Sequence, residues 1–184
     1  MMYRIIPNKS LPIGARKHFA LSFAKSEATD EEISEARRIL RKQSKGAILS
    51  GLSYLIITSV IIYILWINSA LTPGAILLLV LIYSVLDLLF ILFFCPLKHL
   101  FMKNRCCSTC RIYNWDCLMI CLPLIIFPSI YSIVLVAMAV IVFLRWEIAL
   151  WRNPHFFVDK INENLSCAKC DNAICVRKTR HGGM

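Results

Sequence analysis

The chain has 184 residues, of which 58% are hydrophobic and only 17% are charged. A soluble domain averages about half apolar and a quarter charged residues, so this composition argues against an ordinary soluble protein and favours a membrane protein. The net charge of +10 gathers in three segments that flank long uncharged runs, with net +5 over residues 1–46, +3 over 96–116 and +3 over 145–184. Asp87 is the one charge outside these segments.

Residues 1–46 are predicted to form a basic cytoplasmic arm. Charges recur throughout Met1–Lys45, which leaves no room for the apolar run of a cleavable signal peptide. The mixed basic and aromatic stretch Arg16–Lys25 suits either an anionic membrane surface or a partly ordered arm. Thr29-Asp30-Glu31-Glu32 has the pattern of a capping box and predicts an amphipathic helix, with Lys45-Gly46 at the junction with the bilayer. This helix either lies on the membrane or packs on the cytoplasmic face of the protein.

Residues 47–95 are predicted to form a transmembrane hairpin. Ala47–Leu71 carries no charge and is longer than the roughly 20 apolar residues that one crossing requires. The turn at residues 68–74 is also uncharged, and Ala75–Cys95 returns with Asp87 as its single charge. Basic residues flank the hairpin on both outer sides and are absent from its turn. By the positive-inside rule, we expect a multi-pass protein of the cell membrane with a cytoplasmic N-terminus.

Residues 117–151 are predicted to form a bent or re-entrant membrane region. The uncharged run Cys117–Leu144 has 28 residues, too few for two full crossings. A single crossing would place the basic tail outside, against the charge rule. Pro123 and Pro128 interrupt helical hydrogen bonding, which favours a short helix over Cys117–Phe127 and a longer return helix after it. A single crossing remains the alternative.

The cysteines predict a metal site. Two C-x-x-C pairs, Cys107–Cys110 and Cys167–Cys170, lie in the polar segments 96–116 (a cytoplasmic loop) and 152–184 (a cytoplasmic tail). This spacing lets two thiolates bind one tetrahedral ion, and two pairs complete a four-cysteine zinc site. Since 56 residues separate the pairs, a shared ion requires both ends of the region between them to face the same compartment.

The nine cysteines are also open to other interpretations. Iron or an iron–sulfur cluster would use the same four cysteines, with Cys106 and Cys175 as possible additional ligands. Reactive dithiols, disulfides on an oxidising side and unmetallated thiols are further alternatives. The remaining cysteines are expected to pack as small apolar residues: Cys95, Cys117 and Cys121.

Five polar residues in or beside the apolar segments are candidate site residues. A carboxylate at Asp87 is costly in a bilayer, so it is either a proton, ion or substrate site or a structural hydrogen-bond partner. The others mix cations, anions and aromatic neighbours at the inner interface: Arg111, Asp116, Arg145 and Glu147. They suit either a pocket in which arginine holds a lipid phosphate or interfacial anchoring.

The sequence thus predicts an all-α integral membrane protein with an N-terminal amphipathic helix, a transmembrane hairpin, a bent or re-entrant apolar hairpin and a cytoplasmic Cys-rich metal site. Motifs of familiar enzymes are absent. We therefore expect a scaffold or accessory protein that presents a basic surface to anionic lipids, a membrane protein partner or a second copy, and not to nucleic acid. A redox subunit that uses iron, and a small transporter or lipid-handling enzyme that uses Asp87, are the alternatives.

Overall fold

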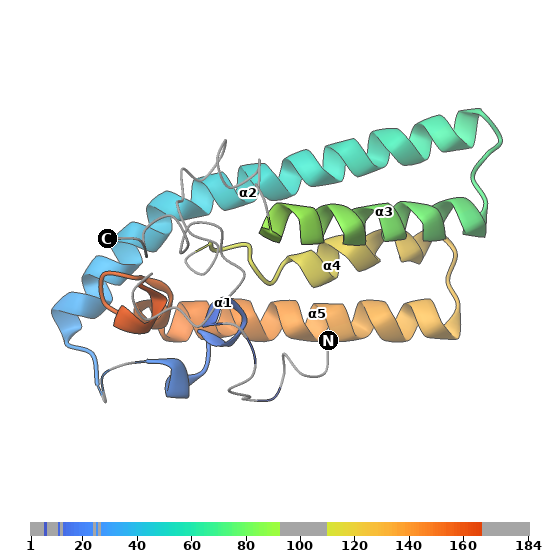
Figure 1. The fold of residues 1–184 in the computed structure, drawn as a ribbon. Helices are drawn as coiled ribbons and strands as arrows, with labels where there is room; N and C mark the ends of the chain where they lie inside the picture. Colours follow the sequence, from blue (N-terminus) through green and yellow to red (C-terminus); the bar gives the residue numbers. More distant parts are fainter. Residues whose placement is uncertain are drawn as a thin grey trace.

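The structure is a computed structural model, and it describes residues 6, 11, 13–23, 25, 27–92 and 110–166. Within these ranges all regular structure is helical, and three helices are long and apolar enough to cross a membrane. They are α2 (Asp30–Ile67), α3 (Pro73–Leu92) and α5 (Ile130–Arg152), which form an elongated bundle (Figure 1). The expected all-helical fold is confirmed for the described residues, and its three long apolar helices could span a membrane.

Helix α2 is one continuous helix of 38 residues. The predicted capping box opens it, because the Thr29 hydroxyl accepts a hydrogen bond from the Glu32 amide and the Glu32 carboxylate accepts one from the Thr29 amide. No break occurs at Lys45-Gly46, where the sequence suggested a junction. At 1.5 Å per residue, α2 is about 57 Å long, nearly twice the hydrocarbon thickness of a bilayer. Its charged first part therefore extends well beyond its apolar part.

Helix α3 returns antiparallel to α2 after the turn at residues 68–72. Ser69 takes up a left-handed backbone conformation in this turn (φ 52°). The Thr72 hydroxyl accepts a hydrogen bond from the Ala75 amide at 3.2 Å, and Pro73 occupies the first helical position, where its missing N–H costs nothing. A hydrogen bond of 3.0 Å between the hydroxyls of Thr58 and Tyr83 links the two helices.

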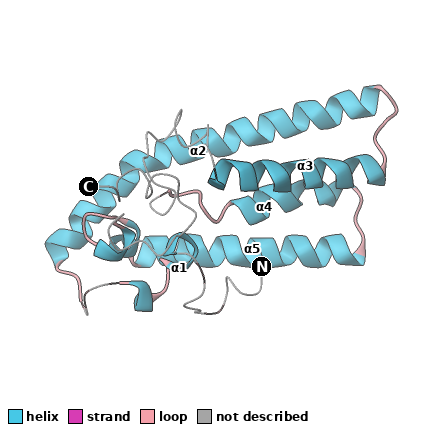
Figure 2. Cartoon of the chain, viewed as in Figure 1, coloured by secondary structure: helices cyan, strands magenta, loops and turns pink. Residues whose placement is uncertain are grey.

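A second, shorter hairpin packs beside the first. Helix α4 (Asp116–Cys121) continues into the 3-10 helix η4 (Leu122–Ile126), and α5 runs back alongside both. The predicted short helix over Cys117–Phe127 is α-helical only to Cys121 and 3-10 to Ile126, and the chain leaves helical geometry before α5. Ser129 begins α5 by exchanging capping hydrogen bonds with Ser132. The loops of both hairpins lie at the same end of the bundle (Figure 2).

A compact cap covers the other end of the bundle. It consists of α1 (Ile13–Arg16) and the 3-10 helices η2 (Ala20–Ser22), η5 (Pro154–Phe157) and η6 (Glu163–Leu165). Ala36 and Leu40, on the predicted apolar stripe of α2, pack against η5 and α5. The amphipathic part of α2 thus packs on the protein itself. The buried cluster comprises Ala36, Leu40, Trp146, Leu150, Phe156, Phe157, Val158 and Ile161.

Candidate functional site

An ion pair between Arg111 and Glu147 lies at the junction of the cap and the apolar bundle. The Arg111 Nη2 atom is 3.2 Å from the Glu147 Oε2 atom, and the two side chains are only 10% and 15% exposed. The indole Nε1 of Trp115 donates to the other carboxylate oxygen of Glu147 at 2.9 Å. Arg111 also donates a hydrogen bond through Nη1 to the hydroxyl of Ser44.

These contacts join the turn that carries Arg111 and Trp115 to both α2 and α5 at one level along the bundle. Trp146 on α5 is buried and donates from Nε1 to the Arg111 carbonyl oxygen at 3.2 Å. Arg111 therefore links Ser44 on α2 to Trp146 and Glu147 on α5. The charged part of α2 ends at Lys45, directly after Ser44. The ion pair consequently marks the level at which the chain changes from charged to apolar.

The network occupies most of the Arg111 guanidinium. Nη1 and Nη2 donate to Ser44 and Glu147, and Nε is buried with no hydrogen-bond partner among the described residues. Arg145 instead is exposed, with its guanidinium 5.6 Å from the centroid of the Phe19 ring. Asp116 accepts a hydrogen bond from the Cys117 amide at 2.7 Å in the first turn of α4. Of the interfacial candidates, the structure pairs Arg111 with Glu147 and leaves Arg145 outside this pair.

Asp87 lies deeper along the bundle on α3 and is half-buried. It follows Tyr83 by four residues, so it shares a helix face with Tyr83 about 6 Å further along. The Tyr83 hydroxyl contacts Thr58, and the nearby Tyr54 donates from its own hydroxyl to the Met119 carbonyl oxygen. Asp87 thus lies on the face of α3 whose Tyr83 contacts the Thr58 hydroxyl of α2.

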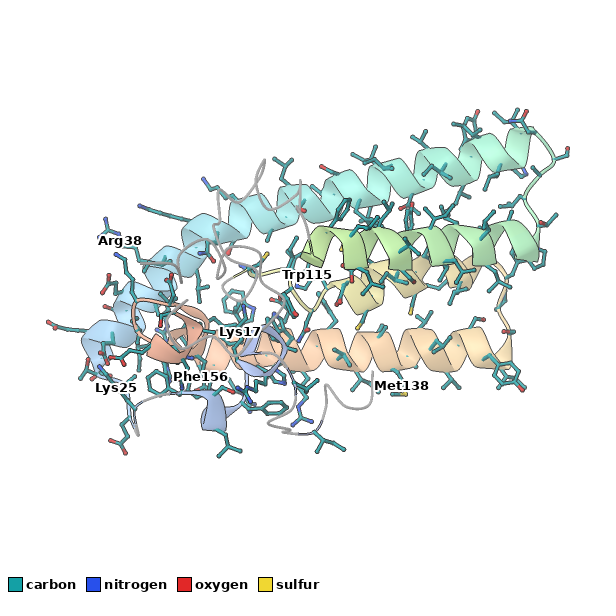
Figure 3. The ribbon with its side chains drawn as sticks, in the orientation of Figure 1. Lys17, Lys25, Arg38, Trp115, Met138 and Phe156 are labelled. Carbon is teal, nitrogen blue, oxygen red and sulfur yellow. The ribbon has the colours of Figure 1, made fainter. Side chains whose placement is uncertain are left out.

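Two residues that the sequence did not single out form the centre of the cap. Lys17 has no exposed surface; its ammonium donates to the Cys110 carbonyl oxygen at 2.9 Å and lies 4.9 Å from the Trp146 ring centroid. Figure 3 shows Lys17 beside α1 at the cap end of the bundle. His18 is 8% exposed and contacts the rings of Phe19 and Trp146. Burial, together with the charge of Arg145, lowers the pKa of His18 to about 4.

The described cysteines are all buried and unbonded to one another. Cys110 packs against Ala47 next to Trp115. Cys117 and Cys121 lie in an apolar cluster with Ile76, the packing expected for them. In the part of the chain that the structure describes, no group of three or more His, Cys, Asp or Glu side chains is arranged to hold a metal ion. The other cysteines lie outside the described residues: Cys95, Cys106, Cys107, Cys167, Cys170 and Cys175.

The N-terminal arm contacts the described chain beside each C-x-x-C pair. The Lys17 ammonium donates to the Cys110 carbonyl oxygen, and the side-chain amide of Asn114 donates to the Ala15 carbonyl oxygen at 3.5 Å. Helix α1 also contacts η6, which ends at Leu165, two residues before Cys167. Cys110 and the chain before Cys167 therefore lie against the same arm at the same end of the bundle.

Comparison with known proteins gives no relative. No protein-family model matches the chain, and neither a curated protein nor a solved structure does. Its function must therefore be inferred from its own residues and their geometry.

Proposed function

We propose that this chain is an integral membrane scaffold or accessory protein whose cytoplasmic face is held together by a four-cysteine zinc site. The ligands would be Cys107, Cys110, Cys167 and Cys170. The observation that carries the proposal is that Cys110 and the chain before Cys167 both pack on the arm around Lys17. Two C-x-x-C pairs can supply four thiolates to one tetrahedral ion, and the described chain next to each pair lies at the same end of the bundle.

The surroundings of Cys110 suit a thiolate centre. A zinc ion with four cysteines carries a net charge of −2, and nearby cations favour the thiolate form. The ammonium group of Lys17, buried beside the Cys110 backbone, contributes such a cation. Because a structural zinc site adds directly to folding free energy, it would fix the loop and the tail against the cap.

The proposed orientation places the cap in the cytoplasm of a multi-pass cell-membrane protein. Both uncharged hairpin turns lie at one end of the bundle, and the described parts of the basic arm and tail lie toward the other end. Helices α2 and α3 would cross the bilayer. Together α4 and η4 are roughly 20 Å long by their rise per residue, which is less than the roughly 30 Å thickness of the hydrocarbon core. They would therefore enter the membrane only partway, as a re-entrant segment, and α5 would return the chain to the cytoplasm.

Metal analysis of the purified full chain tests the zinc proposal. We expect about one zinc ion per chain, since one site of four cysteines holds one ion, and a large loss in Cys107→Ser and Cys170→Ser. Cys117→Ala is the matched control, because Cys117 packs in the apolar cluster and its loss should leave the zinc content unchanged. Absence of zinc from the unaltered chain, with freely reactive thiols, would refute the site. Iron in place of zinc would instead support a redox subunit.

A further inference from the structure

A row of exposed basic side chains lies on α2 immediately before its apolar part. We call it the basic row, and it comprises Arg37, Arg38, Arg41, Lys42 and Lys45. At 100° per residue these five positions fall within an arc of about 140°. The buried residues Ala36, Leu40 and Ala47 fall on the roughly opposite side of the helix. Figure 3 shows Arg38 pointing away from the bundle.

The same face of α2 continues as an exposed apolar strip. Ile48, Leu49, Leu52, Leu55 and Ile56 are all exposed, and the helical repeat places them within the same arc as the basic row. Since α2 is uninterrupted from Asp30 to Ile67, the basic row leads directly into the apolar strip. If the strip faces acyl chains, the basic row faces the headgroups of the same lipids.

Distance along the helix separates the basic row into two parts. Relative to Ala47, Lys45 lies about 3 Å outward, and Lys42 and Arg41 about 8–9 Å outward, by the rise per residue. The headgroup layer is only about 5–8 Å deep on each side, and long basic side chains reach along the helix toward it. Arg38 and Arg37 lie about 14–15 Å outward. They are therefore separated from the outer edge of the headgroup layer by a distance similar to the electrostatic screening length of roughly 8 Å.

The inner members of the basic row have no carboxylate partner in the protein as far as the structure describes it. The ion pairs among the described residues are Lys25–Glu32, Arg111–Glu147 and Lys160–Glu35. Arg41, Lys42 and Lys45 belong to none of these pairs, so their charges are available to an external anion. The negative charge of a phosphodiester above an apolar strip is the complement of this surface.

We infer that Arg41, Lys42 and Lys45 form a binding site for anionic phospholipid headgroups in the leaflet next to the cap. The inference rests on the membrane insertion in the proposed function and is independent of the zinc site. Each cation near a bilayer surface adds about a fivefold preference for anionic lipid. Three cations in two turns of one helix would therefore retain anionic lipids at α2 in preference to zwitterionic ones.

Lipid titration of the purified full chain in detergent, followed by native mass spectrometry, tests this site. The probes are phosphatidylglycerol and phosphatidylcholine, and the variants are K42Q/K45Q and R37Q/R38Q, which remove the same charge from the same helix. We expect phosphatidylglycerol to bind preferentially, K42Q/K45Q to weaken its binding at least fivefold and R37Q/R38Q to weaken it less than about twofold. Soluble glycerol phosphate, which lacks acyl chains, should not compete.

Three results would overturn the inference. They are equal binding of the two lipids, equal effects of the two double variants, and full competition by glycerol phosphate. Zinc content measured in the same samples separates this inference from the proposed function. Lipid selectivity without zinc would support the lipid site and refute the zinc site, whereas zinc without lipid selectivity would refute the lipid site alone.

Discussion

The ammonium group of Lys17 donates a hydrogen bond to the Cys110 carbonyl oxygen at 2.9 Å, and the lysine has no exposed surface. This contact joins the N-terminal arm to the loop that precedes α4, 93 positions away. The same ammonium lies against the aromatic faces of Trp146 and Phe157. A buried charge is tolerated only when it is paired or hydrogen-bonded, so Lys17 should stabilise the cap strongly.

Lys17→Ala is expected to destabilise the protein by about 2–4 kcal/mol. The change removes a charged hydrogen bond, worth about 1.5–3 kcal/mol, and the cation–π contacts. Thermal unfolding in detergent micelles, followed by tryptophan fluorescence, should show Tm lowered by roughly 5–15 °C. Lys25→Ala, at an exposed position, is the control and should change Tm little. Equal effects of the two substitutions would contradict the structural role of Lys17.

Glu147→Gln is expected to cost about 2–3 kcal/mol. It leaves the Arg111 charge in a nearly buried position without its counter-ion, and breaking a fully buried pair costs about 3–5 kcal/mol. The lower figure applies here because both side chains are 10–15% exposed. The double variant R111M/E147M should recover part of the loss, since it leaves no unpaired charge. Glu35→Gln, from an exposed pair with Lys160 at 3.9 Å, should cost less than about 0.5 kcal/mol.

The local features of this fold could be predicted from the sequence. The capping box at Thr29 and the interruption around Pro123 and Pro128 depend only on neighbouring residues, and both are present. The continuity of α2 across Gly46 was not predicted. The change from charged to apolar residues there marks a change of surroundings, whereas a single glycine costs a helix only about 1 kcal/mol.

The candidate site depends on contacts between distant positions, which a single sequence does not contain. Arg111 and Glu147 were both recognised as interfacial residues, but their pairing across 36 positions requires α5 to run back beside the loop. Lys17 and His18 were expected in a basic arm. Their burial arises from the folding of that arm onto α5, and nothing in their immediate neighbours indicates it.

Acidification is expected to destabilise the cap through His18. Burial, reinforced by the positive charge of Arg145, lowers the His18 pKa from 6.5 to about 4. Between these values the unfolded chain binds a proton that the folded chain does not, so stability is complete above about pH 6.5 and is lost progressively as pH falls toward 4. The loss attributable to His18 is on the order of 2–3 kcal/mol.

Measurement of Tm between pH 7.5 and pH 4.5 checks the His18 prediction. His18→Phe, which retains a ring beside Trp146, should flatten the pH dependence. Burial also lowers the pKa of His155, so a smaller dependence of the same sign should remain and should disappear in the double variant with His155→Phe. An unchanged pH profile in His18→Phe would exclude His18 as the responsible group.

Gly51→Val should disrupt the contact between α2 and the Trp115 ring. A Cβ atom at Gly51 would lie 3.3 Å from Trp115 Cζ3, closer than an ordinary van der Waals contact. Trp115 cannot move away freely, because its indole donates to Glu147 and its ring packs on Phe143. The two methyl groups of valine should therefore displace the indole, weaken the Trp115–Glu147 bond and cost about 1–3 kcal/mol as overpacking.

Gly74→Val is the matched control for this test. A Cβ atom at Gly74 would meet only the Thr72 hydroxyl, at 3.8 Å, so Tm should change by no more than a few degrees. The tryptophan emission spectrum gives a second measurement, because a displaced Trp115 indole would change its surroundings in the folded protein. If Gly51→Val left both Tm and the emission spectrum as in the unaltered chain, the close packing of Trp115 on α2 would be refuted. The arrangement in which Arg111 and Glu147 lie beside α2 would then be refuted as well.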